Sequence, residues 1–172
     1  SGTMRGIYGG GQVSALEERE FTKSFAGCVG ISTGAPTAAY FLAGQARLGT
    51  TIYSEECTWP AFIDPKRMVR GGHGADIGFL ADVFRGRVGD KRLDEARIRE
   101  SPTEFLVAVT EREHGLGRLV DGKTVRPDIV HGLAASAAIP GMYRTPMLIG
   151  SRCVVDGGLG MPLPITQVLQ RN

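Results

Sequence analysis

A serine in a glycine-flanked turn is the residue of this sequence best suited to nucleophilic chemistry. Residues 30–34, GISTG, have the form G-x-S-x-G, with Ser32 at the centre. The motif follows a short apolar run, residues 25–31, typical of a buried strand. It precedes an Ala-rich stretch, residues 33–47, typical of a helix. In this strand–turn–helix context a serine hydroxyl is exposed at the carboxyl edge of a sheet, where open α/β sheets bind ligands.

The two flanking glycines are what such a turn requires. The chain reverses so sharply that the serine takes a strained backbone, and Gly30 and Gly34 leave room around it. The N-terminus of the helix that follows favours developing negative charge beside the serine. A plain helix N-cap is the alternative interpretation of Ser32.

A serine hydroxyl is a weak nucleophile and needs a base. The sequence offers three histidines, His73, His114 and His131, and none is marked by its surroundings as the last member of a Ser-His-Asp triad. His131 lies within an expected helix, residues 127–139. An α/β-hydrolase with His131 as base stays open as an alternative.

Asp156 is better placed to serve as the base. It ends an apolar run and is followed by Gly157 and Gly158, which let the backbone turn away sharply. An acid at the carboxyl end of a buried strand faces the same rim as Ser32. Asp-Gly is also a common turn pair, so a purely structural role is the other interpretation.

The elements that must position these side chains alternate along the chain. Strands are expected at residues 25–31, 104–110, 117–122 and 147–155, and helices at 33–47, 78–84, 127–139 and in the tail. Strands that alternate with helices predict an α/β fold with a mainly parallel central sheet. A chain of 172 residues corresponds to about one domain, here with an irregular insert at about residues 50–100.

Composition excludes several classes of protein. Twenty basic and 18 acidic residues leave a net charge of +2, too small for nucleic-acid binding through bulk charge. No apolar run reaches the roughly 18 residues needed for a transmembrane segment. Three cysteines without a close pair favour a reduced, cytoplasmic protein. Glycine, at 25 residues, is about twice as frequent as usual, which indicates tight turns or close backbone approaches.

Four blocks together resemble the patatin-like phospholipase family. The opening SGTMRGIYGGG is similar to its G-G-G-x-R-G segment, GISTGAP to its G-x-S-x-G turn, ASAAIPGMYRTP to its A-S-x-A-x-P segment, and VVDGGLGMPLPI to its D-G-G/A motif. The blocks occur in the family's order and cover both ends of the chain. The resemblance implies a three-layer α/β sandwich and a serine lipid acyl hydrolase that requires no metal or cofactor.

The resemblance also implies the site residues. Ser32 would be the nucleophile and Asp156 the base of a Ser–Asp dyad. An oxyanion hole would be formed by the backbone N–H groups of Gly2, Thr3, Met4 and Arg5. The family's motif has glycine where this chain has Ser1 and Thr3, and the strand that normally precedes it is not in the sequence. We therefore expect a partial patatin-like domain.

The expected partner is a lipid or another acyl ester. The insert contains apolar residues that would receive acyl chains or contact a lipid surface, unless they simply pack in the core: Trp59, Phe62, Ile63, Phe79, Leu80, Val83 and Phe84. Its arginines would meet lipid phosphate or lie on a solvated face: Arg67, Arg70, Arg85 and Arg87. A non-catalytic lipid-binding module with the same fold is a further alternative, suggested by Thr3.

Overall fold

The structure, a computed structural model, describes residues 5–58 and 60–171. Its strands are β1 (Gly27–Ile31), β2 (Glu104–Glu111), β3 (Gly117–Asp121), β4 (Met147–Ile149) and β5 (Arg152–Asp156). Its longer helices are α1 (Gly6–Glu18), α2 (Gly34–Leu42), α6 (Ile77–Phe84), α7 (Glu95–Glu100) and α8 (Ile129–Ser136). Its short helices are η2 (Phe21–Lys23), α3 (Ala46–Gly49), α4 (Ile52–Glu55), α5 (Pro65–Val69), α9 (Gly157–Gly160) and α10 (Ile165–Leu169).

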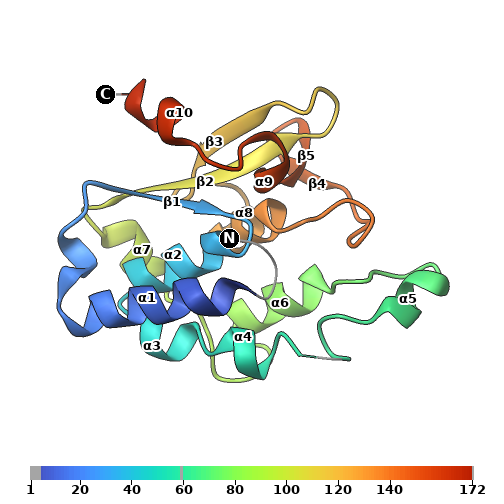
Figure 1. Cartoon of the computed structure of the whole chain (residues 1–172), viewed down its shortest axis with the longest axis horizontal. Helices are drawn as coiled ribbons and strands as arrows, with labels where there is room; N and C mark the ends of the chain where they lie inside the picture. Colours follow the sequence, from blue (N-terminus) through green and yellow to red (C-terminus); the bar gives the residue numbers. More distant parts are fainter. Residues whose placement is uncertain (1–4, 59, 172) are drawn as a thin grey trace.

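Strands and helices form one mixed sheet with helices packed on it, which confirms the α/β class (Figure 1). The strand order is β1-β2-β5-β4, with β3 paired to β2 as well. β1 and β2 are parallel, whereas the pairs β2–β3, β2–β5 and β4–β5 are antiparallel. The sheet is thus less parallel than the sequence predicted. β3 follows β2, and β5 follows β4, through connections too short for a crossover, so each pair forms a hairpin.

The helices are distributed unevenly over the sheet. In the view of Figure 1, α1 to α4 and α6 lie on one side and the short α9 and α10 on the other. The three layers implied by the resemblance are therefore present, but one of them is thin. The core lies on the crowded side, where α2 is buried from Ala35 to Leu42 and packs on β1. β2 is buried from Phe105 to Glu111, as expected for a central strand.

Helix α1 owes its close packing to glycines. A Cβ at Gly6 would lie 2.7 Å from the ring of Tyr53, and one at Gly10 would lie 2.8 Å from the side chain of Thr50. These two glycines are one turn apart and share a face of α1. The helix therefore fits against α3 and α4 only where it lacks side chains.

The middle segment is less irregular than its composition suggested. Residues 50–100 contain α4, α5, α6 and α7, joined by loops. The side chain of Lys91 is buried among three carboxylates and lies 2.6 Å from Glu55 and 2.5 Å from Asp90. The prediction of a solvated helix in the charged stretch 85–100 is confirmed for α7, where Ile98 alone is buried. No helix of the described residues combines the length and apolar character needed to cross a bilayer.

Candidate active site

The turn between β1 and α2 holds Ser32 in a left-handed conformation. β1 ends at Ile31, α2 begins at Gly34, and Ser32 between them has φ 52°. This region is unfavourable for a residue with a side chain, by roughly 1–3 kcal/mol, and such strain collects at functional sites. A Cβ at Gly30 would lie 2.4 Å from Cα of Ala35, so glycine there lets α2 fold back directly onto β1. The strained serine turn predicted from the sequence is thus present.

The structure places Ser32 and Asp156 in direct contact. The Ser32 Oγ donates a hydrogen bond of 2.6 Å to Oδ2 of Asp156, and both residues are buried. The sheet register explains how residues so far apart in sequence meet. Ile31 pairs with Ala108 on β2, and Asp156 pairs with the next residue, Val109. Adjacent positions of one central strand therefore carry the ends of both neighbouring strands.

Backbone contacts around Asp156 fix its carboxylate. Oδ1 of Asp156 accepts a hydrogen bond of 2.8 Å from the N–H of Gly158. A Cβ at Gly157 would lie 2.1 Å from the carbonyl oxygen of Ala108, so only glycine fits there. The Thr110 hydroxyl donates to the Asp156 carbonyl at 2.7 Å. The two glycines after the aspartate therefore serve the carboxylate itself, one by clearance and one by hydrogen bonding.

Burial governs the acid–base behaviour of Asp156. Removal from water raises the pKa of its carboxyl above the ordinary value, and the hydrogen bonds from Ser32 and Gly158 oppose that rise. No lysine, arginine or histidine of the described part of the chain forms an ion pair with Asp156. A carboxylate whose pKa is raised is a stronger base than one in water, which is what proton abstraction from an alcohol needs.

One further residue of the site was not assigned a role from the sequence. Ser136, the last residue of α8, is fully buried, and its Oγ accepts a hydrogen bond of 2.9 Å from the Ser32 N–H. The same hydroxyl donates to the Ala108 carbonyl at 2.6 Å. Ser136 belongs to the ASAAIP block, and a serine inside this apolar helical run was the available signal.

Most of the expected oxyanion segment lies outside the described residues. This applies to Gly2, Thr3 and Met4. Arg5 is described: it is exposed, stands at the N-cap of α1, and its side chain makes no capping hydrogen bond. Arg5 lines a surface cleft together with Thr33 and Gly34. The start of α1 therefore lies beside the Ser32 turn.

A narrow apolar cavity of about 50 Å³ opens at Ser32. Its walls come from α4, α6, α8 and the loops around them. They include four of the insert residues singled out in the sequence: Phe62, Ile63, Leu80 and Phe84. Val83 and Phe79 instead pack in or against the core, and Trp59 lies outside the described residues. The insert is therefore partly core and partly the lining of a cavity suited to a hydrocarbon chain.

The insert arginines are mostly engaged within the protein. Arg67 pairs with Asp76 at 3.1 Å, Arg85 with Asp128 at 3.0 Å, and Arg87 with Asp82 at 2.8 Å. Arg70 is exposed and forms no ion pair within residues 5–58 and 60–171. Of the four arginines, Arg70 alone keeps its charge available to an outside anion.

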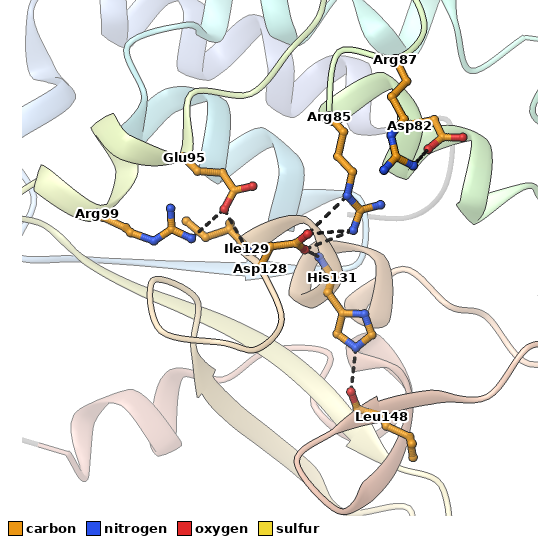
Figure 2. Close-up of polar contacts among 9 residues, drawn as sticks. All are labelled: Asp82, Arg85, Arg87, Glu95, Arg99, Asp128, Ile129, His131 and Leu148. Atoms are coloured by element: carbon orange, nitrogen blue, oxygen red, sulfur yellow. Dashed lines mark hydrogen bonds and ion pairs between the residues drawn. The ribbon is translucent and has the colours of Figure 1, made fainter.

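The histidines do not reach the serine, so the triad interpretation is wrong. Figure 2 shows His131 directed at the carbonyl of Leu148, which its Nε2 contacts at 2.7 Å. The aspartate near it, Asp128, caps α8 and pairs with Arg85. His73 stacks on Tyr143, and His114 lies beside Glu113 at the surface. The hydroxyl of Ser32 bonds to a carboxylate instead of an imidazole.

Comparison with known proteins gives a consistent assignment. A family model described as patatin-like phospholipase matches residues 1–169. An uncharacterized protein of Escherichia coli K12, YjjU, is 25% identical over 172 residues, which are 99% of this chain and 47% of that protein. The crystal structure of VipD from Legionella pneumophila is similar with a TM-score of 0.52 at 15% identity, covering 92% of this chain and 45% of that one. The VipD likeness concerns the fold alone. The chain spans about half the length of both proteins.

Proposed function

Because the chain belongs to the patatin-like phospholipase family, we propose that it is a serine lipid acyl hydrolase that works through a Ser32–Asp156 dyad. Family membership supports lipid hydrolysis at the coarse level. The proposal of this dyad rests on one observation, the 2.6 Å hydrogen bond from the Ser32 hydroxyl to a buried carboxylate beside an apolar cavity. Two serine and aspartate side chains held in this way have the donor and acceptor that nucleophilic catalysis needs.

In the first half of the proposed reaction Ser32 becomes acylated. The Ser32 Oγ attacks the ester carbonyl while its proton passes to Oδ2 of Asp156. The carbonyl oxygen becomes an oxyanion, for which the N–H groups of Gly2, Thr3, Met4 and Arg5 are the proposed donors. The bond to the alcohol then breaks, and the alcohol leaves with the proton that Asp156 received.

In the second half water releases the fatty acid. Asp156, ionised again, takes a proton from a water molecule, and the resulting hydroxide attacks the acyl carbonyl. The bond to Ser32 Oγ breaks, and Ser32 regains the proton from Asp156. The dyad returns to its starting state, so the same carboxylate acts as base and then as acid in each half.

The proposed substrate is an ester with a hydrocarbon acyl chain. The cavity next to Ser32 is lined by side chains such as Phe62, Leu80 and Leu133, which favour a hydrocarbon over a polar group. We also propose peripheral contact with a lipid surface as the way in which the substrate is reached, and no nucleic-acid partner. Because the chain spans about half of its relatives, the substrates and partners of a whole protein are part of the same proposal.

Hydrolysis of p-nitrophenyl butyrate by Ser32→Ala and Asp156→Asn tests the dyad. We expect each variant to lose about 10³-fold or more in kcat, because a nucleophile and its base act as a unit. Matched controls are Ser54→Ala, an exposed serine on α4, and Asp82→Asn, a surface aspartate paired with Arg87. The controls should keep wild-type rates. Full activity in either dyad variant would refute the mechanism.

A fluorophosphonate probe separates catalysis from the non-catalytic lipid-binding alternative. Such probes bond covalently only to an activated serine, so we expect labelling of Ser32 in the wild type and none in Ser32→Ala. A wild-type protein that binds vesicles but is never labelled would favour the binding module. Labelling confined to Ser32 would exclude it.

A further inference from the structure

The hydroxyl of Ser136 stands between two backbone groups of the candidate site. Ser136 is 0% exposed. It accepts the Ser32 N–H at 2.9 Å and donates to the Ala108 carbonyl at 2.6 Å. Both contacts cross long stretches of sequence, because Ser32 lies 104 positions before Ser136 and Ala108 lies 28 positions before it. A single buried side chain therefore ties α8 to the Ser32 turn and to the central strand.

This hydroxyl continues the β1–β2 ladder at the point where the chain leaves the sheet. β1 pairs with β2 as far as Ile31 opposite Ala108. The next N–H along the chain belongs to Ser32, and it is connected to the Ala108 carbonyl through the Ser136 hydroxyl. The inserted oxygen holds Ser32 away from β2, which matches its departure from strand geometry to φ 52°.

We propose that Ser136 is a positioning residue that holds Ser32 in the left-handed conformation and so keeps the Ser32 hydroxyl within reach of Asp156. This inference deepens the proposed function and rests on it. The carbonyl that Ser136 binds also lies against Gly157, where a Cβ would come within 2.1 Å of it. Ala108 is thus a common reference point for the two halves of the dyad, and Ser136 connects Ser32 to that point.

Removal of the hydroxyl has two structural outcomes, and both displace the nucleophile. If the turn stays in place, the buried Ser32 N–H loses its partner, which is unfavourable. If the turn relaxes, the Ser32 N–H moves towards the Ala108 carbonyl, and Ser32 leaves the left-handed region. A displacement of about 1 Å at a reacting group can lower a rate by about 10²-fold. The apolar cavity does not include Ser136, so substrate binding should persist.

Steady-state kinetics on p-nitrophenyl butyrate test this role. We expect Ser136→Ala to lower kcat by roughly 10²-fold with KM within about threefold of wild type. Ser136→Thr, which keeps the hydroxyl, should restore much of that loss. The matched control is Tyr40→Phe, which removes another buried hydroxyl, bonded to the Lys91 carbonyl at 2.5 Å and remote from the dyad. It should lower thermal stability and leave kcat unchanged.

Two results would overturn the proposal. One is a Ser136→Ala variant that loses stability as Tyr40→Phe does and keeps its kcat. The other is a loss of kcat that Ser136→Thr fails to relieve although it is folded. Should Ser136→Ala not fold, Ser136→Cys takes its place. Because a thiol is a weaker donor and acceptor, its kcat should then fall between those of wild type and Ser32→Ala, and wild-type kcat would count against the proposal.

A crystal structure of Ser136→Ala separates this inference from the proposed function. We expect Ser32 to leave positive φ or its Oγ to move beyond hydrogen-bond distance of Asp156, whatever the activity of the wild type. An inactive wild type with a displaced Ser32 in the variant would reject the proposed function alone. An unchanged Ser32 conformation and an unchanged contact with Asp156 would reject the positioning role alone.

Discussion

At the scale of single residues, the site depends on a carboxylate in an environment that disfavours its charge. Asp156 is 5% exposed and has no cation as partner in the described part of the chain. Burial raises the pKa of its carboxyl, and two hydrogen bonds limit the rise. The same burial that makes Asp156 a useful base therefore works against the folded state whenever the carboxyl is ionised.

Stability should accordingly improve when this charge is removed. The carboxyl of Asp156 has a higher pKa folded than unfolded, so its contribution is most favourable at low pH and is lost as the pH rises through the folded-state pKa. We expect Asp156→Asn to be more stable than wild type at pH 7, and this advantage to shrink as the pH falls below the folded-state pKa. Urea unfolding of both proteins at several pH values measures the difference. A variant less stable than wild type at pH 7 would contradict this explanation.

The same pKa direction sets the pH dependence of the proposed activity. Asp156 must be ionised to accept a proton, so kcat/KM should rise with pH through the pKa of the free enzyme's carboxyl. Because that pKa is raised, the rising limb should lie above the ordinary aspartate value of about 3.9. A pH–rate profile for p-nitrophenyl butyrate measures it, and a midpoint at or below the ordinary value would argue against Asp156 as the base.

Among single residues, the sequence indicated those with strong local patterns and missed the one that acts at a distance. Ser32 and Asp156 follow apolar runs and precede glycines, so their places at strand ends could be predicted. The role of Ser136 depends on where the β1–β2 register ends, which is a property of the sheet. No local pattern around Ser136 contains that information.

At the scale of elements, the fit of α1 against its neighbours depends on which of its glycines face them. Gly10 faces Thr50, with 2.8 Å available for a Cβ, whereas a Cβ at Gly11 would have nothing within 4 Å. Both positions lie inside the same helix, so they have a similar intrinsic preference for alanine. The pair therefore separates packing from helix propensity.

We expect the two alanine substitutions to change stability in opposite directions. Gly11→Ala should stabilise the protein by about 0.5–1 kcal/mol through helix propensity. Gly10→Ala should destabilise it by about 1–3 kcal/mol, because its methyl group overlaps Thr50. Chemical denaturation of both variants measures the two free energies. Equal stabilisation by both would mean that α1 does not pack against Thr50 as described.

Element boundaries and sheet pairing show where prediction from local pattern ends. The strand before Ser32 and the helix after it were predicted because apolar runs and flanking residues encode them. The third expected helix begins at Ile129 instead of residue 127 because Asp128 caps it, accepting a hydrogen bond from the His131 N–H. The antiparallel partners of β2 were not predicted, since strand direction depends on which connections become hairpins.

At the scale of the whole molecule, one protruding segment fits the proposed contact with a lipid surface. Residues 63–75 leave the body as an arm that includes α5, as Figure 1 shows, and the Ile63–Ala75 bridge closes its base. Both bridge residues also line the cavity at Ser32. The arm therefore starts where a substrate chain would enter.

The exposed surface of this arm combines positive charge with an apolar side chain. Lys66 and Arg70 are exposed and form no ion pair in the described structure, and Val69 between them is 90% exposed. Arg144 joins them, since its guanidinium donates to the Gly71 carbonyl at 3.2 Å. Basic side chains near an anionic membrane contribute about 1 kcal/mol each, so this arrangement favours anionic lipid over a neutral surface.

Vesicle binding by the Ser32→Ala protein tests the arm without interference from hydrolysis. We expect binding to vesicles that contain phosphatidylserine, weaker binding to pure phosphatidylcholine, and a decrease with added salt. Lys66→Glu with Arg70→Glu should weaken binding by about tenfold or more. The matched control is Arg19→Glu with Arg92→Glu, two exposed arginines outside the arm and equally free of ion pairs within the described residues. If both double variants lose affinity equally, overall charge is responsible and the arm has no special part. If the arm variant alone loses affinity while hydrolysis of p-nitrophenyl butyrate by the same double variant of the Ser32 protein is unchanged, the arm delivers the site to the lipid and takes no part in the chemistry.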